Sequence, residues 1–168
     1  IASVQVTYRY GFGDIIQKML VMNGSMFEYG ITVKNKLDPI RYQFQIKDDF
    51  NNGILTEWKN VSITDNDKPD LLEDDTPLEG TTGDRHLFRI KVEDNIRVSD
   101  VVLTYRYGEG ASSEVEMTSE DNGWWKLPMF LPDGSTDPLY YHISAVDSSG
   151  NVNQTLEKVV NITDNDIA

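Results

Sequence analysis

The sequence has no cysteine, only two histidines in 168 residues and no long apolar run. Disulfide bonds, thiolate nucleophiles and cysteine-ligated metals are therefore excluded. His86 and His142 do not stand in a metal-binding spacing such as H-E-x-x-H, and the sequence contains neither a G-x-S-x-G elbow nor a glycine-rich phosphate loop. No segment approaches the roughly 18 apolar residues of a membrane-spanning helix, and no signal peptide opens the chain. We predict a protein that is not an enzyme and, because the chain does not begin with methionine, a portion of a longer one.

Positive charge is also scarce. The chain has 15 Lys and Arg against 28 Asp and Glu, which gives a formal net charge of -13. Nucleic acids and anionic membranes need clustered basic residues, so neither is an expected partner. Cations are the expected small partners, although an acidic surface also serves solubility alone. A hydrophobic content of 39% is enough for packed cores.

The sequence repeats itself once. Residues 7–13 (TYRYGFG) return as residues 104–110 (TYRYGEG), and residues 63–67 (ITDND) return as residues 162–166 (ITDND). The offset is 97 at first and becomes 99 after a two-residue difference in length. Such self-similarity indicates two copies of one structural unit.

Each copy has the pattern of β-strands separated by turns rich in Gly, Asn, Asp and Pro. In the second copy, Phe88, Ile90 and Val92 alternate with polar residues, which gives one strand a buried face and an exposed face. About seven such strands in about 100 residues is typical of an immunoglobulin-like sandwich. We predict an all-β protein of two tandem immunoglobulin-like antiparallel β-sandwiches, of fibronectin type III or cadherin-like form, over residues 1–67 and 68–168.

The first copy is incomplete. Because Ile1 aligns with Val98, nothing in the first copy matches residues 68–97, which carry the first two strands of the second copy, the first of them near residues 76–83. The first domain is therefore expected to begin at its third strand. A sandwich without two strands exposes a core face and unpaired edge groups. Either a preceding segment or a neighbouring molecule supplies them by strand addition, and we favour the preceding segment.

Several motifs are shared with a known class of module. The segments LEGTTGD (78–84), VEDN (92–95), TYRYG (104–108) and SAVDSSGN (144–151), with the closing TDND, together resemble the tandem Ig-like repeats of archaeal cell-surface and surface-layer-type proteins. The resemblance covers nearly the whole chain. It implies a structural module of an extracellular lattice, sheath or filament that contacts other copies of the same protein.

The acidic segment between the two copies is similar to a cadherin linker. Residues 64–69 (TDNDKP) correspond to the acidic junction after the last strand, and residues 145–150 (AVDSSG) to the turn before it. This resemblance implies that calcium binds at the junction.

The topology of a sandwich also predicts a calcium site at the junction. The chain enters an immunoglobulin-like sandwich at the end where the loops after the second and sixth strands lie. Calcium takes about six to eight oxygen ligands, which must converge from several loops. We therefore predict that calcium binds the carboxylates of Asp65, Asp67, Glu93, Asp94 and Asp147 and stiffens the junction. The alternative is that Asp, Asn and Gly stand there because they form turns.

Four N-x-[ST] sequons predict N-linked glycans if the chain is secreted. Their acceptors are Asn23, Asn60, Asn153 and Asn161. We favour Asn23 and Asn153, which we expect in turns, over Asn60 and Asn161, which we expect in or beside strands.

Two further features bear on function. Trp124 and Trp125 are adjacent, so a strand places them on opposite faces. One is expected in the core, and the other is free to stack on a sugar ring or to pack against a neighbour. An adhesion or carbohydrate-binding module and an accessory domain of a secreted enzyme are therefore alternatives. The acidic run 73–75 falls in a linker-like stretch between Pro69 and Pro77, where nothing favours acid-base catalysis.

Overall fold

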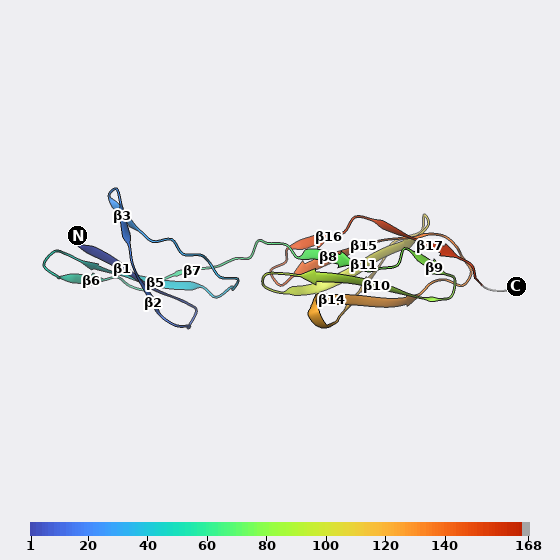
Figure 1. Cartoon of the computed structure of the whole chain (residues 1–168), viewed down its shortest axis with the longest axis horizontal. Coiled ribbons are helices and arrows are strands. Elements are labelled where there is room, and N and C mark those ends of the chain that lie inside the picture. The colour runs from blue at the N-terminus through green and yellow to red at the C-terminus, as the bar shows by residue number, and fades with distance from the viewer. Residues whose placement is uncertain (166–168) are drawn as a thin grey trace. The chain divides into compact units, whose positions relative to one another are not determined.

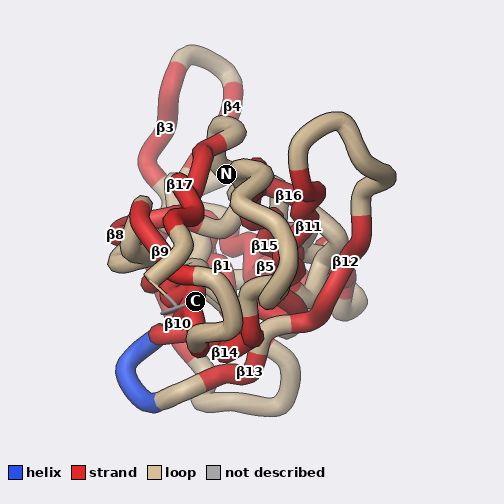
Figure 2. The backbone as a smooth tube through the Cα atoms, turned by 90° about the vertical axis from the view of Figure 1, so that its right-hand side faces the viewer, coloured by secondary structure: helices blue, strands red, loops and turns tan. Residues whose placement is uncertain are grey.

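The computed structural model describes residues 1–165 and divides the chain into two compact units, with the boundary between Asp65 and Asn66. Both units are built from strands, drawn as blue to cyan arrows in the first unit and green to red arrows in the second (Figure 1). Within the described residues, the single helical element is the 3-10 turn η1 (Asp121–Gly123), the blue segment of Figure 2. The prediction of an all-β protein is confirmed.

The second unit is a complete sandwich of two sheets. Its strands are β8 (Asp70–Asp74), β9 (Glu79–Thr81), β10 (Arg85–Glu93), β11 (Val98–Tyr107), β12 (Ser113–Glu116), β13 (Thr118–Ser119), β14 (Trp124–Phe130), β15 (Leu139–Asp147), β16 (Val152–Gln154) and β17 (Lys158–Thr163). One sheet has the order β13-β14-β10-β8, and the other has the order β12-β11-β15-β17-β9 with β16 beside β15. The pairs are antiparallel except for β9 and β17, which run parallel. This division of strands is the immunoglobulin arrangement that the sequence predicts.

The core of the second unit lies between its two sheets. Along β10, Phe88, Ile90 and Val92 are buried while the ends of the strand are exposed, so the predicted alternation is confirmed. These side chains pack against buried residues of β11, β15 and β17 in the opposite sheet. The rings of Phe88 and Tyr141 meet edge to face with their centroids 5.1 Å apart. Such burial is the main stabilising contribution in a sandwich of this size.

The prediction of a linker-like stretch is wrong at residues 73 and 74, whereas Asp75 lies just after a strand. Asp70–Asp74 forms β8, which pairs with β10 on its outer side. Asp74 is largely buried, and its Oδ2 accepts hydrogen bonds from Lys158 Nζ at 2.7 Å and from Tyr141 Oη at 3.2 Å. A buried carboxylate needs such partners. Because both donors lie far along the chain, the local acidic pattern does not reveal the strand.

The first unit contains one five-stranded sheet and a separate two-stranded hairpin, where the second unit contains two facing sheets. Its strands are β1 (Ser3–Tyr10), β2 (Ile16–Met19), β3 (Val21–Asn23), β4 (Met26–Glu28), β5 (Ile40–Lys47), β6 (Gly53–Leu55) and β7 (Lys59–Val61). The sheet has the order β2-β1-β5-β6 with β7 beside β5, and β3 and β4 form a separate hairpin that stands away from it (Figure 1). By the repeat, β1, β5 and β7 correspond to β11, β15 and β17.

The strands that precede β11 in the second unit have no counterpart in the first unit, as predicted. This segment contains three strands, β8, β9 and β10, rather than the expected two, because β8 and β9 join different sheets. The buried apolar cluster of the first unit is reduced to Val6, Tyr8 and Ile40. Many large apolar side chains of this unit are exposed, among them Met22, Met26 and Val61.

His86 gives the second unit a pH-dependent stability. It lies on the buried face of β10, and burial lowers its pKa despite a hydrogen bond with the backbone of Pro77. The unfolded chain therefore binds a proton at a higher pH than the folded chain. Stability contributed by neutral His86 is complete above the unfolded pKa of about 6.5 and is lost as pH falls toward the folded value, by at most about 1.4 kcal/mol per pH unit.

We expect the melting temperature of the second unit to fall when the pH is lowered from 7.5 to 5.5. Carboxylates contribute little to the change of stability in this range. The fall should be smaller in His86→Leu than in the native chain, as measured by thermal unfolding at both pH values. His142→Gln is the matched control. An equal fall in the native chain and in His86→Leu would rule out His86 as the source.

Candidate functional site

Two loops of the second unit come together at the end where the chain enters it. The loop after β10 begins at Asp94, and the loop after β15 follows Asp147. They are joined by a hydrogen bond from Ser148 N to Arg97 O at 2.9 Å. The entering segment joins them through Asp67, whose Oδ2 accepts a hydrogen bond from Asn95 Nδ2 at 2.7 Å. Three segments distant in sequence therefore converge, as the sandwich topology requires.

Asp147 is held by its own turn. Its side chain is buried, and Oδ1 accepts hydrogen bonds from Ser149 N and Asn151 N, both at 2.8 Å. Oδ2 accepts a hydrogen bond from Asn151 Nδ2 at 2.7 Å. Burial acts to raise the pKa of Asp147, but hydrogen bonds from Asn151, Ser149 and Gly150 outweigh it, so the pKa lies below its ordinary value. The carboxylate is therefore ionised at neutral pH.

The same turn occurs in the first unit around Asp48. Its Oδ1 accepts hydrogen bonds from Phe50 N at 2.9 Å and Asn52 N at 2.8 Å, and its Oδ2 accepts one from Asn52 Nδ2 at 2.8 Å. The side-chain hydrogen bond from Asn52 is the largest cause of the lowered pKa of Asp48. Turn formation thus accounts for the hydrogen bonds of Asp147, and they need no bound ion.

Asp94 is not explained in this way. Its Oδ2 accepts hydrogen bonds from Ile96 N and Arg97 N, both at 2.8 Å. Its Oδ1 is buried and has no hydrogen-bond partner among residues 1–165. Asp94 and Asp147 each offer a carboxylate oxygen, and these oxygens lie within 4.8 Å of one another. A buried carboxylate oxygen without a donor is costly, and a second carboxylate nearby adds repulsion, so the arrangement favours a cation.

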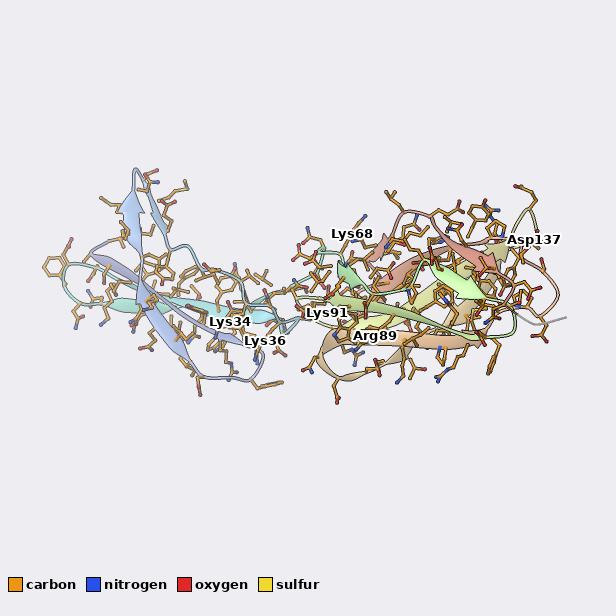
Figure 3. All side chains as sticks on the ribbon, turned by 45° about the vertical axis from the view of Figure 1, so that its right-hand side comes forward. Lys34, Lys36, Lys68, Arg89, Lys91 and Asp137 are labelled. Carbon is orange, nitrogen blue, oxygen red and sulfur yellow. The ribbon has the colours of Figure 1, made fainter. Side chains whose placement is uncertain are left out.

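The remaining predicted ligands lie in different surroundings. Glu93 is exposed at the end of β10, and its Oε1 forms an ion pair with Lys91 Nζ at 3.0 Å. Lys91 and Arg89, both labelled in Figure 3, are carried by this strand. Glu93 is therefore paired with a basic residue of its own strand. Asp65 is the last residue of the first unit and precedes the entering segment directly.

The adjacent tryptophans of β14 have different neighbours. Trp125 packs against the core of the second unit. Trp124 lines a surface hollow with Glu120, Asp121 and Asn122, and the guanidinium of Arg89 lies 4.1 Å from its ring centroid. A cation at this distance already occupies one face of the ring. The sequence does not reveal this contact, because Arg89 belongs to the neighbouring strand.

The sequon asparagines all lie in strands, so the expectation of turns for Asn23 and Asn153 is wrong. Asn153 belongs to β16, which pairs with β15, and its Nδ2 donates a hydrogen bond to Pro69 O at 2.9 Å. Asn23 ends β3 and is exposed, with its Nδ2 bonded to Glu28 Oε1 at 2.8 Å. Asn60 in β7 and Asn161 in β17 are exposed.

No protein-family model matches the sequence, and no curated protein matches it. Three solved structures resemble it in fold. The tetra-tandem repeat in the extending region of a large adhesion protein is 14% identical, with a TM-score of 0.48, and the match covers 96% of this chain and 42% of that one. The titin domains z1z2 in complex with telethonin are 10% identical, with a TM-score of 0.46 and coverage of 99% and 84%. The FN1–FN3 domains of chicken CNTN1 are 12% identical, with a TM-score of 0.41 and coverage of 95% and 56%.

The chain therefore spans less than half the length of the adhesion-protein segment that it matches. Within residues 1–165, no helix is long and apolar enough to cross a membrane.

Proposed function

We propose that the chain is a non-catalytic structural segment of an extracellular surface protein, which spans distance by joining like units in series. The observation that carries this proposal is the internal repeat, in which the same strands, the same aspartate turn and the same TDND segment occur twice. Chains built from repeated units reach length in this way. The resemblance to surface-layer-type repeats supports assembly with other copies, in a lattice, sheath or filament.

N-linked glycans belong to the same proposal. Asn23, Asn60 and Asn161 have exposed side chains, whereas the amide of Asn153 is engaged with Pro69. We assign the glycans to the three exposed acceptors. Expression in a secreting, glycosylating host followed by mass spectrometry of glycopeptides tests this assignment, and a glycan on Asn153 alone would contradict it.

We assign calcium to the acidic end of the second unit. The buried Asp94 Oδ1 and the ionised Asp147 offer two oxygen ligands within the second unit. Asp67 of the entering segment is bonded to Asn95, which follows Asp94 in the same loop. Carboxylate and amide oxygens are the ligands that calcium prefers. An ion shared between the entering segment and the two loops would restrict the motion of that segment.

Asp94→Asn is expected to weaken calcium binding at least tenfold, because it removes one of the two neighbouring carboxylate charges. Isothermal titration of the full chain with calcium chloride measures the affinity. Glu114→Gln removes the same charge from an exposed position on β12 and should leave the affinity unchanged. Absence of saturable binding to the native chain, or equal affinity in Asp94→Asn, would rule out this site.

The stiffening role needs a separate measurement. Small-angle scattering of the full chain should show a narrower distribution of maximum dimensions with calcium than with a chelator. The same distribution under both conditions would leave the ion without a mechanical role. Asp94→Asn should scatter alike with and without calcium.

A further inference from the structure

The first unit has an apolar hollow on the inner face of its sheet, with a volume of about 520 Å³. Side chains from β1, from β5 and from the segment between them line it, including Val6, Tyr8, Leu20, Phe27, Ile31 and Phe44. In the second unit the same face is the floor of the core. A concave hollow lined mainly by apolar side chains is the kind of surface at which a ligand or another segment binds.

The repeat shows what covers this face in the second unit. Leu103, Leu139 and Ile143 stand where the first unit has Val6, Ile40 and Phe44, and all three are 0% exposed. Their cover is β10, whose Phe88 and Ile90 belong to the same core. The first unit has the floor of the core without the strand that closes it.

A second observation concerns residues 25–31, which correspond to β14 of the second unit. There β14 pairs along its whole length with β10, from Lys91 and Trp124 to Arg85 and Phe130. In the first unit only Met26–Glu28 forms a strand, and it pairs with β3 instead. A strand needs a neighbour for its backbone groups. The irregular course of this segment is therefore the local consequence of an absent neighbour.

The third observation identifies the chemistry of the absent segment. Tyr141 and Lys158 donate hydrogen bonds to Asp74 on β8 and are paired across β15 and β17. The first unit has Tyr42 and Lys59 at the same positions, in the same cross-strand pair. Among residues 1–165, no hydrogen bond or ion pair links Tyr42 Oη or Lys59 Nζ to a carboxylate. The donors of the network are present without their acceptor.

We propose that the hollow is the docking site of a three-stranded segment joined directly in front of Ile1 and equivalent to β8–β10. The strand equivalent to β10 supplies alternating apolar side chains to the hollow, and the strand equivalent to β8 supplies a carboxylate that accepts hydrogen bonds from Tyr42 and Lys59. In the second unit, only residues 94–97 separate β10 from β11, so a directly joined segment has the required reach. A second copy of the chain offers no such segment, since its β8 and β10 are paired within their own unit.

The experiment uses the full chain extended at its N-terminus by a copy of residues 68–97, so that Arg97 precedes Ile1 as it precedes Val98. We expect the fluorescence of the apolar dye ANS to fall several-fold. Amide exchange in β1 and β5 should slow at least tenfold, as measured by mass spectrometry of peptic fragments. The matched control carries Phe88→Asp and Ile90→Asp within the extension only, and it should behave like the unextended chain.

The polar contact is tested in the same background. Asp74→Asn within the extension, or Tyr42→Phe with Lys59→Met, should reduce the added protection, whereas the latter pair should not alter β1 exchange in the unextended chain. Equal effects of the native and aspartate-substituted extensions, or no effect of either, would overturn the proposal. So would an unextended chain that is a dimer by light scattering and exposes the hollow only on dilution.

Discussion

Replacing Ile143 by alanine is expected to destabilise the second unit by about 2–5 kcal/mol. The side chain is 0% exposed in the centre of β15, between the two sheets. Removing it leaves a cavity that surrounding strands cannot fill without breaking their pairing. Urea unfolding in a Trp58→Phe background measures this cost, because only Trp124 and Trp125 then report.

The corresponding change in the first unit should cost much less. Phe44 occupies the same position on β5, but it borders the open hollow and is only partly buried. Phe44→Ala therefore enlarges a space already open to solvent. We expect this variant to lose less than about 1.5 kcal/mol of stability. Amide hydrogen exchange of β5 measures the loss. Equal costs at Ile143 and Phe44 would mean that the two cores are equally closed.

Asp74→Ala is expected to destabilise the second unit by about 3 kcal/mol. The change removes the carboxylate that accepts the hydrogen bond of the Tyr141 hydroxyl and leaves Lys158 without its counter-ion. Breaking a buried pair costs about 3–5 kcal/mol, and we take the low end because the Lys158 side chain is 38% exposed. Burial, followed by the charge of Asp74, raises the pKa of Tyr141, so the tyrosine stays a donor at all ordinary pH values.

A second substitution separates charge from packing. Lys158→Met in the Asp74→Ala background removes the unpaired ammonium and should restore part of the lost stability, as measured by the same urea unfolding. If the loss of unfolding free energy in the double variant equals the sum of the losses in the two single variants, the two residues do not interact.

The strand pattern of the second unit was predictable because alternation is local. Phe88, Ile90 and Val92 identify a half-buried strand from five consecutive residues. β8 was not predictable on these grounds, because its burial depends on an acidic residue whose donors are contributed by β15 and β17. The repeat could have helped: Tyr42 and Lys59 reappear as Tyr141 and Lys158, which indicates a shared partner.

Part of the candidate site was predictable as well. Sandwich topology alone indicates that the loops after β10 and β15 lie together, and Asp94 and Asp147 follow from it. The ion pair between Glu93 and Lys91 could also be anticipated, since residues two apart on a strand share a face. The unpartnered Oδ1 of Asp94 could not be foreseen, because a backbone turn decides which oxygen receives the hydrogen bonds.

Amide hydrogen exchange of the native, unextended chain tests the central claim most directly. The claim is that the second unit is a closed sandwich, whereas the main sheet of the first unit has an open face. Peptides from β11 and β15 should be protected by the full free energy of unfolding of the second unit, while those from β1 and β5 should exchange at least tenfold faster. Equal protection of the corresponding strands would contradict the account.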